Sequence, residues 1–276
     1  MKLRVVELLL VTTVPTMVLA EGGWPSIQLM AITLIGGTLA AGGANAINMY
    51  IDRDIDKLMV RTQNRPLVTG ALTPRAAMIF AIGLEIVAFL VLWAGANLLA
   101  AVLAVSATLF YVFVYSLWLK RTSKQNIVIG GAAGAMPVLV GWAAVTNSLG
   151  WAPVVLFIVI FLWTPPHFWA LAIRHADDYK AAGVPMMPVV VSLERTVRSM
   201  TTYAVLLTLS TLVLVPVAEL GWIYGITALI FGVAFVIGSV RLGSDPSPKR
   251  SMRLFTFSIT YVTAVFVALT ADVLLR

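Results

Sequence analysis

Three oxygen-bearing side chains recur at intervals of four residues in the segment NAINMYIDRDIDKLMVRTQNRPL: Asn48, Asp52 and Asp56. Four residues turn an α-helix by about 400°, so these side chains share one helix face over about 12 Å. Carboxylate and amide oxygens suit a hard cation such as Mg²⁺, which binds proteins through few carboxylates together with substrate phosphates. The stripe therefore predicts a magnesium site for a diphosphate substrate. Asp54 points elsewhere, and we interpret it as a solvated or ion-paired residue.

A second acidic cluster follows a later apolar segment, in WTPPHFWALAIRHADDYKAAGVPMMP, which contains Asp177 and Asp178. A single cluster at the end of a membrane helix is most simply interpreted as charges that mark the membrane interface. Two clusters on separate helices and on the same side of the membrane favour catalysis, because they can hold metal ions between them.

Basic residues surround both acidic clusters in the sequence. Together they supply enough fixed positive charge to bind the non-bridging oxygens of a diphosphate, although each one taken alone is typical of a residue that orients the chain in a membrane. These residues are Arg61, Arg65, Lys120, Arg121, Lys124 and Arg174.

A histidine lies within an apolar segment, directly after two prolines: His167 follows Pro165 and Pro166. An ionisable group inside a membrane segment is a functional-site hypothesis by default, and the prolines remove backbone hydrogen bonds, which is tolerated where a helix lines a cavity. The alternative is a histidine that forms a hydrogen bond to a neighbouring helix for packing. Glu7 and Glu85 raise the same question, and the sequence gives neither a specific role.

The composition requires a lipid environment for these residues. Of 276 residues, 60% are hydrophobic and 11% are charged, a balance that a water-soluble domain could not hide in its interior. The absence of cysteine excludes disulfides, thiolate zinc sites, iron–sulfur clusters and cysteine nucleophiles. The net charge of +7 is better explained by loop orientation than by nucleic-acid binding, which we do not expect.

The apolar runs predict an all-α membrane bundle of nine transmembrane helices, in a single domain that covers residues 1–276. Each span needs about 20 residues to cross a hydrocarbon core of about 30 Å. Turn-forming residues at 95–97, 146–150 and 219–222 divide runs that would be too long for one span. The predicted spans are Val5 to Ala20, Pro25 to Ile51, Ala76 to Ala94, Leu98 to Leu119, Ile127 to Val145, Ala152 to Ile173, Met200 to Val217, Trp222 to Val240 and Leu254 to Leu274.

Positive charge is segregated across this arrangement. With nine spans, all Lys and Arg residues except Arg276 fall on one side, from Lys2 and Arg4 at the N-terminus onward. Because Lys and Arg stay on the cytoplasmic side, this predicts a cytoplasmic N-terminus and an external C-terminus. The first apolar segment has no A-x-A-like cleavage site, so we expect a retained helix and not a signal peptide.

The acidic stripe with a second aspartate-rich loop, inside a nine-helix membrane protein, resembles the UbiA-type intramembrane prenyltransferase superfamily. Within it, five motifs in order resemble the heme O synthase family, also called the protoheme IX farnesyltransferases, and the resemblance covers essentially the whole chain. The superfamily's second motif has two aspartates four residues apart, whereas here that spacing offers His175 and Tyr179 beside the adjacent aspartates. The motifs are NMYIDRDIDKLMVRTQNRPL, YSLWLKR, NIVIGGAAGAMPVLVGW, TPPHFWALAI and DDYKAAGVPMMPVV.

The resemblance implies farnesyl diphosphate and heme B as substrates, Mg²⁺ as cofactor, and an active site on the cytoplasmic side of a bacterial inner membrane. A downstream heme-modifying enzyme is an implied partner. Tyr115, with Tyr111, is placed to shield a farnesyl cation by its ring face, although an interfacial anchor is the simpler role. His167 is implied on the heme side, as an iron ligand or a partner of a propionate. The implied metal and catalytic residues are Asn48, Asp52, Asp56 and Asp178, with Asp177 as a further metal ligand, and the implied diphosphate contacts are Arg61, Arg65, Lys120 and Arg174.

Two other functions fit parts of the sequence. A prenyltransferase for a phenolic acceptor, as in quinone synthesis, would need the same diphosphate machinery. A transporter would carry ionisable groups across the whole membrane, whereas here they concentrate at one face and the outer half is nearly neutral. The sequence therefore favours an enzyme over an ion pathway.

Overall fold

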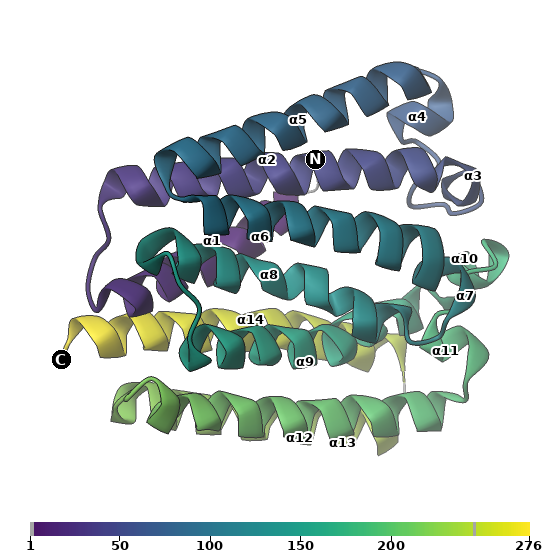
Figure 1. Ribbon diagram of the computed structural model, residues 1–276. Coiled ribbons are helices and arrows are strands. Elements are labelled where there is room, and N and C mark those ends of the chain that lie inside the picture. The colour runs from purple at the N-terminus through teal and green to yellow at the C-terminus, as the bar shows by residue number, and fades with distance from the viewer. Residues whose placement is uncertain (1–2, 245–246) are drawn as a thin grey trace.

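The computed structural model describes residues 3–244 and 247–276, with side chains from residue 11 onward. The predictions made for Lys2, Arg4 and Glu7 lie outside the described side chains, because all three residues precede residue 11. Every regular element in these ranges is a helix, and the long helices run side by side in one bundle (Figure 1). The long helices are α1 (Leu3–Glu21), α2 (Ile27–Ile51), α5 (Pro74–Gly95), α6 (Leu98–Leu109) with its continuation, α8 (Asn126–Thr146), α9 (Trp151–Arg174), α12 (Leu193–Val217), α13 (Trp222–Ser244) and α14 (Pro248–Leu274).

Eight helices in the described part of the chain are long and apolar enough to cross a membrane. Many large apolar side chains on their outer faces are exposed, for example Ile79 at 63% and Leu209 at 54%, as expected for surfaces in contact with lipid. The all-helical membrane architecture is therefore confirmed. The count of nine, which adds α1, and the cytoplasmic N-terminus stay predictions.

The turns between spans lie where the sequence predicts them. Helix α5 ends at Gly95, and Asn97 caps α6 by accepting a hydrogen bond of 2.9 Å from the Ala100 N–H. Helix α8 ends before Asn147, and α12 ends before Glu219. Both of these residues have positive φ angles, of 50° and 52°, which a helix cannot continue through.

Two predicted spans begin too late in the sequence. Helix α12 begins at Leu193 and not at Met200, and α14 begins at Pro248 and not at Leu254. The polar first turns are helical because Ser192 and Ser247 cap them through their side chains. Hydropathy marks only the part of a helix that lies in lipid, so it misses the turns that project into the interface.

The short elements gather at one end of the bundle (Figure 1). A π-helix, η1 (Phe110–Leu119), continues α6 and runs into the single turn α7 (Lys120–Thr122) at this end. The acidic stripe and the second acidic cluster belong to this end, because they lie on α2, α3 and α10. The remaining short helices are α3 (Arg53–Asp56), α4 (Pro66–Thr69), α10 (Ala176–Ala181) and α11 (Met187–Val190).

Small residues allow close packing of the helices that position this end. Helix α2 packs along α5, and a side chain at Gly36 would overlap Leu92, while one at Gly43 would overlap Glu85. Close approach through small residues is the usual way in which helices associate in a membrane. Glu85 accepts a hydrogen bond of 3.1 Å from the Thr108 hydroxyl, so it links α5 to α6 as a half-buried hydrogen-bonding group.

Candidate active site

The acidic stripe forms a buried face at the end of α2. Asn48, Asp52 and Asp56 are 4%, 0% and 1% exposed, while Arg53 and Asp54 between them are exposed. Helical hydrogen bonds continue through the stripe, because the Asp52 N–H donates to the Asn48 carbonyl at 2.9 Å and the Asp56 N–H donates to the Asp52 carbonyl at 2.8 Å. The three side chains therefore share one face, although the helix changes from α2 to α3 at Asp52.

The π-helix η1 supplies a contact that the sequence did not predict. The Ser116 hydroxyl donates to the Tyr111 carbonyl five residues earlier, at 2.9 Å, and accepts from the Asn48 Nδ2 at 2.9 Å. The same Nδ2 donates to Asp52 at 2.8 Å. A π-helix widens the turn and commonly occurs at functional sites. Here it places Ser116 against the acidic stripe and fixes which way the Asn48 amide faces.

Each buried carboxylate has a cation beside it. The Lys120 ammonium forms an ion pair with Asp52, and Lys120 is itself only 7% exposed. The Arg65 guanidinium donates to Asp56 at 2.5 Å. A buried charge is tolerated only when it is paired, so these cations offset the cost of burying the two carboxylates. The structure thus brings together Asp52, Asp56, Lys120 and Arg65 from the predicted site.

One oxygen of the acidic stripe remains without a hydrogen bond. The Asp52 Oδ1 is buried and accepts none from the described residues, and the Arg121 guanidinium lies 3.8 Å from it. A buried carboxylate oxygen without a donor is costly, and a bound cation would satisfy it. The carboxylate oxygens of Asp52 and Asp56 are ligands of the kind that Mg²⁺ prefers.

Asp54 is separate from this buried group, as its predicted orientation requires. Its two oxygens each lie 2.7 Å from the Arg121 guanidinium, in an exposed two-pronged ion pair. The Arg121 hydrogen bonds lower the pKa of Asp54 to about 2. The interpretation of Asp54 as an ion-paired surface residue is confirmed.

The second acidic cluster lies on α10 at the same end of the bundle (Figure 1). The Arg61 guanidinium donates to the Tyr179 hydroxyl at 3.3 Å and lies over its ring, so the segment after α3 contacts α10. Burial raises the pKa of the Tyr179 phenol, and the nearby Arg61 partly offsets this. Asp178 lies 3.7 Å from His175, whereas Asp177 is exposed.

The two acidic clusters are not joined into one ligand shell. Within residues 3–244 and 247–276, no three Asp, Glu or His side chains lie close enough together to hold one metal ion. Arg174 is exposed, and its guanidinium has no hydrogen bond or ion pair within the same ranges. The structure therefore places the second cluster near the first but leaves its side chains open to solvent.

His167 lies between α9 and α14. Its Nδ1 is 2.6 Å from the Ser258 hydroxyl, and its ring stacks on Trp163 and Phe255 with centroid distances of 4.1 and 4.5 Å. This is the hydrogen bond between helices that the packing alternative requires. The other ring nitrogen, Nε2, has no hydrogen-bond partner among the described residues.

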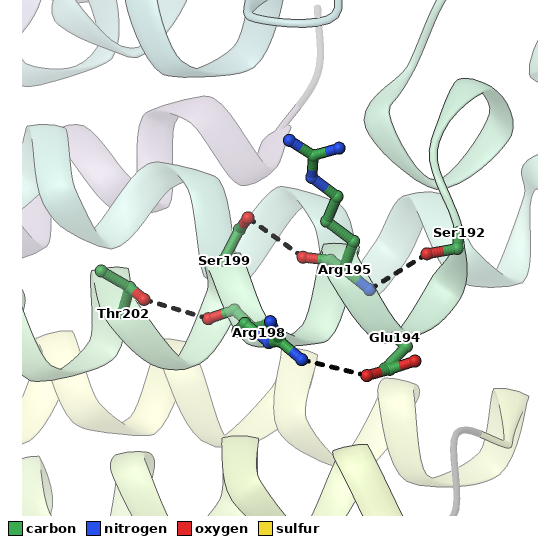
Figure 2. A pocket seen from close by; sticks show the side chains of 6 residues that line it. All are labelled: Ser192, Glu194, Arg195, Arg198, Ser199 and Thr202. Atoms are coloured by element: carbon green, nitrogen blue, oxygen red, sulfur yellow. Dashed lines mark hydrogen bonds and ion pairs between the residues drawn. The ribbon is translucent and has the colours of Figure 1, made fainter.

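One surface hollow lies away from these residues, on the polar first turns of α12 (Figure 2). Figure 2 shows Arg198 donating to Glu194, at 3.1 Å, while the Arg195 guanidinium points away from both. Both members of the pair are exposed, so it contributes little to stability. None of the predicted site residues lines this hollow.

Buried carboxylates paired with cations lie at one end of an all-helical membrane bundle, so this membrane protein has a site that can bind an anionic group beside its apolar helices. The chain belongs to the UbiA prenyltransferase family, whose model matches residues 9–263.

Curated relatives extend this likeness over the full length. A protoheme IX farnesyltransferase of Frankia casuarinae is 54% identical, over 99% of this chain and 96% of its own. A protein of the same name from Streptomyces avermitilis is 49% identical, over 100% and 92%.

Solved structures share the fold at low sequence identity. A digeranylgeranylglyceryl phosphate synthase structure superposes with a TM-score of 0.82 at 18% identity, over 99% of this chain and 95% of its own. A UbiA homologue from Archaeoglobus fulgidus, bound to GPP and Mg²⁺, superposes with a TM-score of 0.70 at 19% identity, over 97% of each chain.

Proposed function

We propose that this protein transfers the farnesyl group of farnesyl diphosphate to a vinyl group of heme B and so produces heme O. The geometric observation that carries the proposal is the buried, ion-paired Asp52 with its unsatisfied Oδ1. The choice of acceptor is supported by the full-length relatives named protoheme IX farnesyltransferase.

The first step is departure of diphosphate from an allylic carbon. The C–O bond breaks, the diphosphate leaves with the electron pair, and a farnesyl cation remains. Lys120 and Arg65 already lie at the acidic stripe, so they can bind the non-bridging oxygens of an incoming diphosphate and stabilise its growing charge. A Mg²⁺ ion held by Asn48, Asp52 and Asp56 would add further charge stabilisation at the same oxygens.

The second step joins the two substrates. The vinyl group attacks the first carbon of the farnesyl cation, and the new cation lies on the carbon beside the porphyrin ring. Water adds there and loses one proton, which leaves a hydroxyethylfarnesyl chain. The balance is heme B, farnesyl diphosphate and water giving heme O and inorganic diphosphate, so no oxidant is needed.

Two aromatic residues of η1 lie beside the path of the cation in this proposal. Tyr111 and Tyr115 stack with a centroid distance of 5.3 Å, on the helix that also carries Ser116. Their ring faces can stabilise a passing carbocation. We assign them the role of shielding the cation from premature capture by water.

The remaining predicted residues complete the substrate contacts. We assign Arg61 and Arg174 to the diphosphate and Asp177 and Asp178 to its metal, as a group that closes when substrate binds. We assign His167 to the heme side, through its Nε2. The protein is an integral membrane protein, and we place it in the bacterial inner membrane with its active site on the cytoplasmic side, where a heme-modifying enzyme receives the product.

Mass spectrometry of extracted heme tests the proposal directly. Membranes containing the protein, incubated with heme B, farnesyl diphosphate and Mg²⁺, should convert heme B into a species heavier by one farnesyl group and one hydroxyl group. A parallel incubation replaces heme B by a phenolic quinone precursor. Prenylation of the phenol without any change in heme B would overturn the acceptor assignment and favour the quinone pathway.

A further inference from the structure

The first turns of α12 place two arginines beside the surface hollow of Figure 2. Arg195 and Arg198 line this hollow together with Ser192 and Glu194. Arg198 donates to Glu194 at 3.1 Å, whereas the Arg195 guanidinium has no hydrogen bond or ion pair within the described part of the chain. A guanidinium carries several N–H donors and no acceptor, so an unpaired one at a surface hollow can bind an anion.

The helix ends around the hollow are positively charged. The segments 192–199 and 241–253 join the start of α12, the end of α13 and the start of α14, and their acidic residues in the sequence are Glu194 and Asp245. The basic residues of the same segments outnumber them. They are Arg195, Arg198, Arg241, Lys249, Arg250 and Arg253.

The hollow continues into an apolar groove between α12 and α13. Leu206 lines the groove from α12, and Val240 lines it from α13. Arg198 and Thr202 line both the hollow and the groove, so the two are continuous. A charged end that leads into an apolar channel on the outside of a membrane bundle matches the headgroup and acyl chain of a lipid.

Close helix packing limits the groove at two points along the contact between α12 and α13. A side chain at Gly232 would overlap Thr208, and one at Gly243 would lie 3.4 Å from Val197. Between these two contacts the outer side chains stay exposed, for example Leu206 at 44%. The two helices therefore form the floor of the groove, and its open side faces the surroundings of the bundle.

The charged and apolar parts lie on one face of α12. Arg198, Thr202 and Leu206 follow at intervals of four residues, so each is rotated by only about 40° from the one before. With a rise of about 1.5 Å per residue, Leu206 lies about 12 Å further along the helix than Arg198. This spacing places the arginine at the membrane interface and the leucine among the acyl chains.

We propose that the groove between α12 and α13 binds a phospholipid with an anionic headgroup, its phosphate at Arg195 and Arg198 and one acyl chain along Leu206 and Val240. The Ser192 hydroxyl accepts from the Arg195 N–H at 3.3 Å, so its own proton is available to a phosphate oxygen. The positive charge of the helix ends selects an anionic lipid, because a zwitterionic headgroup would bring its ammonium against the same guanidinium groups.

This lipid site is separate from the candidate active site. None of the predicted site residues lines the hollow or the groove, so the inference does not depend on the proposed function. The carboxylate at the hollow, Glu194, is exposed and paired with Arg198, and it has no buried partner carboxylate with which to hold a metal ion. The hollow therefore suits a phosphate that binds to arginine, and not a magnesium-bound diphosphate.

Lipid binding by the purified full-length chain in detergent tests the proposal. The probes are phosphatidylglycerol and phosphatidylcholine with the same acyl chains, and native mass spectrometry measures the affinity for each. The wild type should bind phosphatidylglycerol about tenfold more tightly. The double variant Arg195→Gln with Arg198→Gln should lose this preference, while its melting temperature in phosphatidylcholine micelles stays unchanged, because the pair with Glu194 is exposed.

The matched control removes the same amount of charge elsewhere. Arg75 and Arg253 are exposed and line neither the hollow nor the groove, so Arg75→Gln with Arg253→Gln should keep the preference for phosphatidylglycerol. An equal loss in both double variants would mean that only total charge matters, which overturns the site. Equal wild-type affinity for the two lipids, or a lowered melting temperature of the Arg195 and Arg198 variant, would also overturn it.

A second pair of variants tests the apolar part of the site. Leu206→Trp places a larger side chain in the groove and should weaken phosphatidylglycerol binding about tenfold. Leu209→Trp is the matched control, since Leu209 is also exposed on α12 but does not line the groove, and it should bind normally. Unchanged binding by Leu206→Trp would place the acyl chain elsewhere.

Competition identifies the source of the bound phosphate group. Neither inorganic phosphate nor farnesyl diphosphate should displace phosphatidylglycerol from the wild type, because neither carries both the headgroup and the pair of acyl chains. Displacement by inorganic phosphate would identify a site for a free anion. Displacement by farnesyl diphosphate would identify a substrate site, and either result would overturn the assignment to a phospholipid.

Discussion

The two acidic clusters lie at the same end of the bundle but in opposite environments. Asp52 and Asp56 are buried and paired with Lys120 and Arg65. Asp177 is exposed, and Asp178 lies 3.7 Å from His175. Similar residue types therefore form one cluster that is buried and paired with cations and another that is more exposed.

The difference shows how a diphosphate site can be stable before its substrate arrives. In the buried cluster the cations Lys120 and Arg65 offset much of the cost of burying the carboxylates. The exposed cluster needs no such partners because water solvates it. We infer that the buried cluster sets the position of the substrate and that the exposed cluster closes over it.

The largest expected effect comes from removing the central buried carboxylate. Asp52→Ala should reduce heme O formation by at least about a hundredfold, since it removes both a metal ligand and the partner of Lys120. The variant should still insert into the membrane, because the hydropathy of α2 is unchanged. The measurement is product formation per unit of inserted protein. Normal turnover would refute the assignment of Asp52 as a metal ligand and the inference that the buried cluster positions the substrate.

The next largest effect tests whether the buried pair is a matched unit. Lys120→Met should destabilise the protein by about 3–5 kcal/mol, because it leaves Asp52 buried without its cation. The double variant Asp52→Asn with Lys120→Met should recover most of this loss, while remaining inactive. Thermal unfolding of Lys120→Met, Asp52→Asn and the double variant in detergent measures the coupling. Additive losses in the double variant would mean that the two side chains do not depend on each other.

Periodicity and charge were enough to predict much of this arrangement. The spacing of Asn48, Asp52 and Asp56 predicts a shared face because a helix repeats every 3.6 residues. The apolar runs and turn residues predict the bundle and most of its turns. Both signals are local, so they can be read from a single sequence.

Features that depend on distant contacts could not be predicted. The contact between Asn48 and Ser116 joins residues that are 68 positions apart in the sequence. It depends on a π-helix that no local sequence pattern predicts. In the same way, Lys120 and Lys124 lie in one loop, and only the packing of η1 on α2 selects Lys120 as the partner of Asp52. The sequence also cannot reveal that the buried Asn126 side chain lacks hydrogen-bond partners among the described residues, because this depends on the residues that fold around it.

A smaller effect is expected in the exposed cluster, and it should differ between the two aspartates. Asp178→Asn should raise the KM for farnesyl diphosphate about tenfold, and Asp177→Asn should change it only a few-fold, because Asp178 is the less exposed and lies 3.7 Å from His175. Neither change should lower the melting temperature measurably. Steady-state kinetics with varied farnesyl diphosphate separates the two. Equal KM effects of the two variants, or a loss of activity as large as that of Asp52→Ala, would mean that burial does not distinguish the roles of these aspartates.

The smallest effect is expected at Asp54. This residue lies between Asp52 and Asp56 in the sequence, but its side chain is exposed, like that of Asp177. Its pKa of about 2 lies below the usual 3.8, so its pair with Arg121 stabilises the folded protein above about pH 4 and is lost as the pH falls through about 2. Because Asp54 is 60% exposed, the contribution should be less than about 1 kcal/mol. Asp54→Asn should therefore keep near-normal activity, with a small stability loss at pH 7 that disappears in high salt. A loss of activity comparable to that of Asp52→Ala would show that burial does not separate the catalytic aspartates from their neighbours.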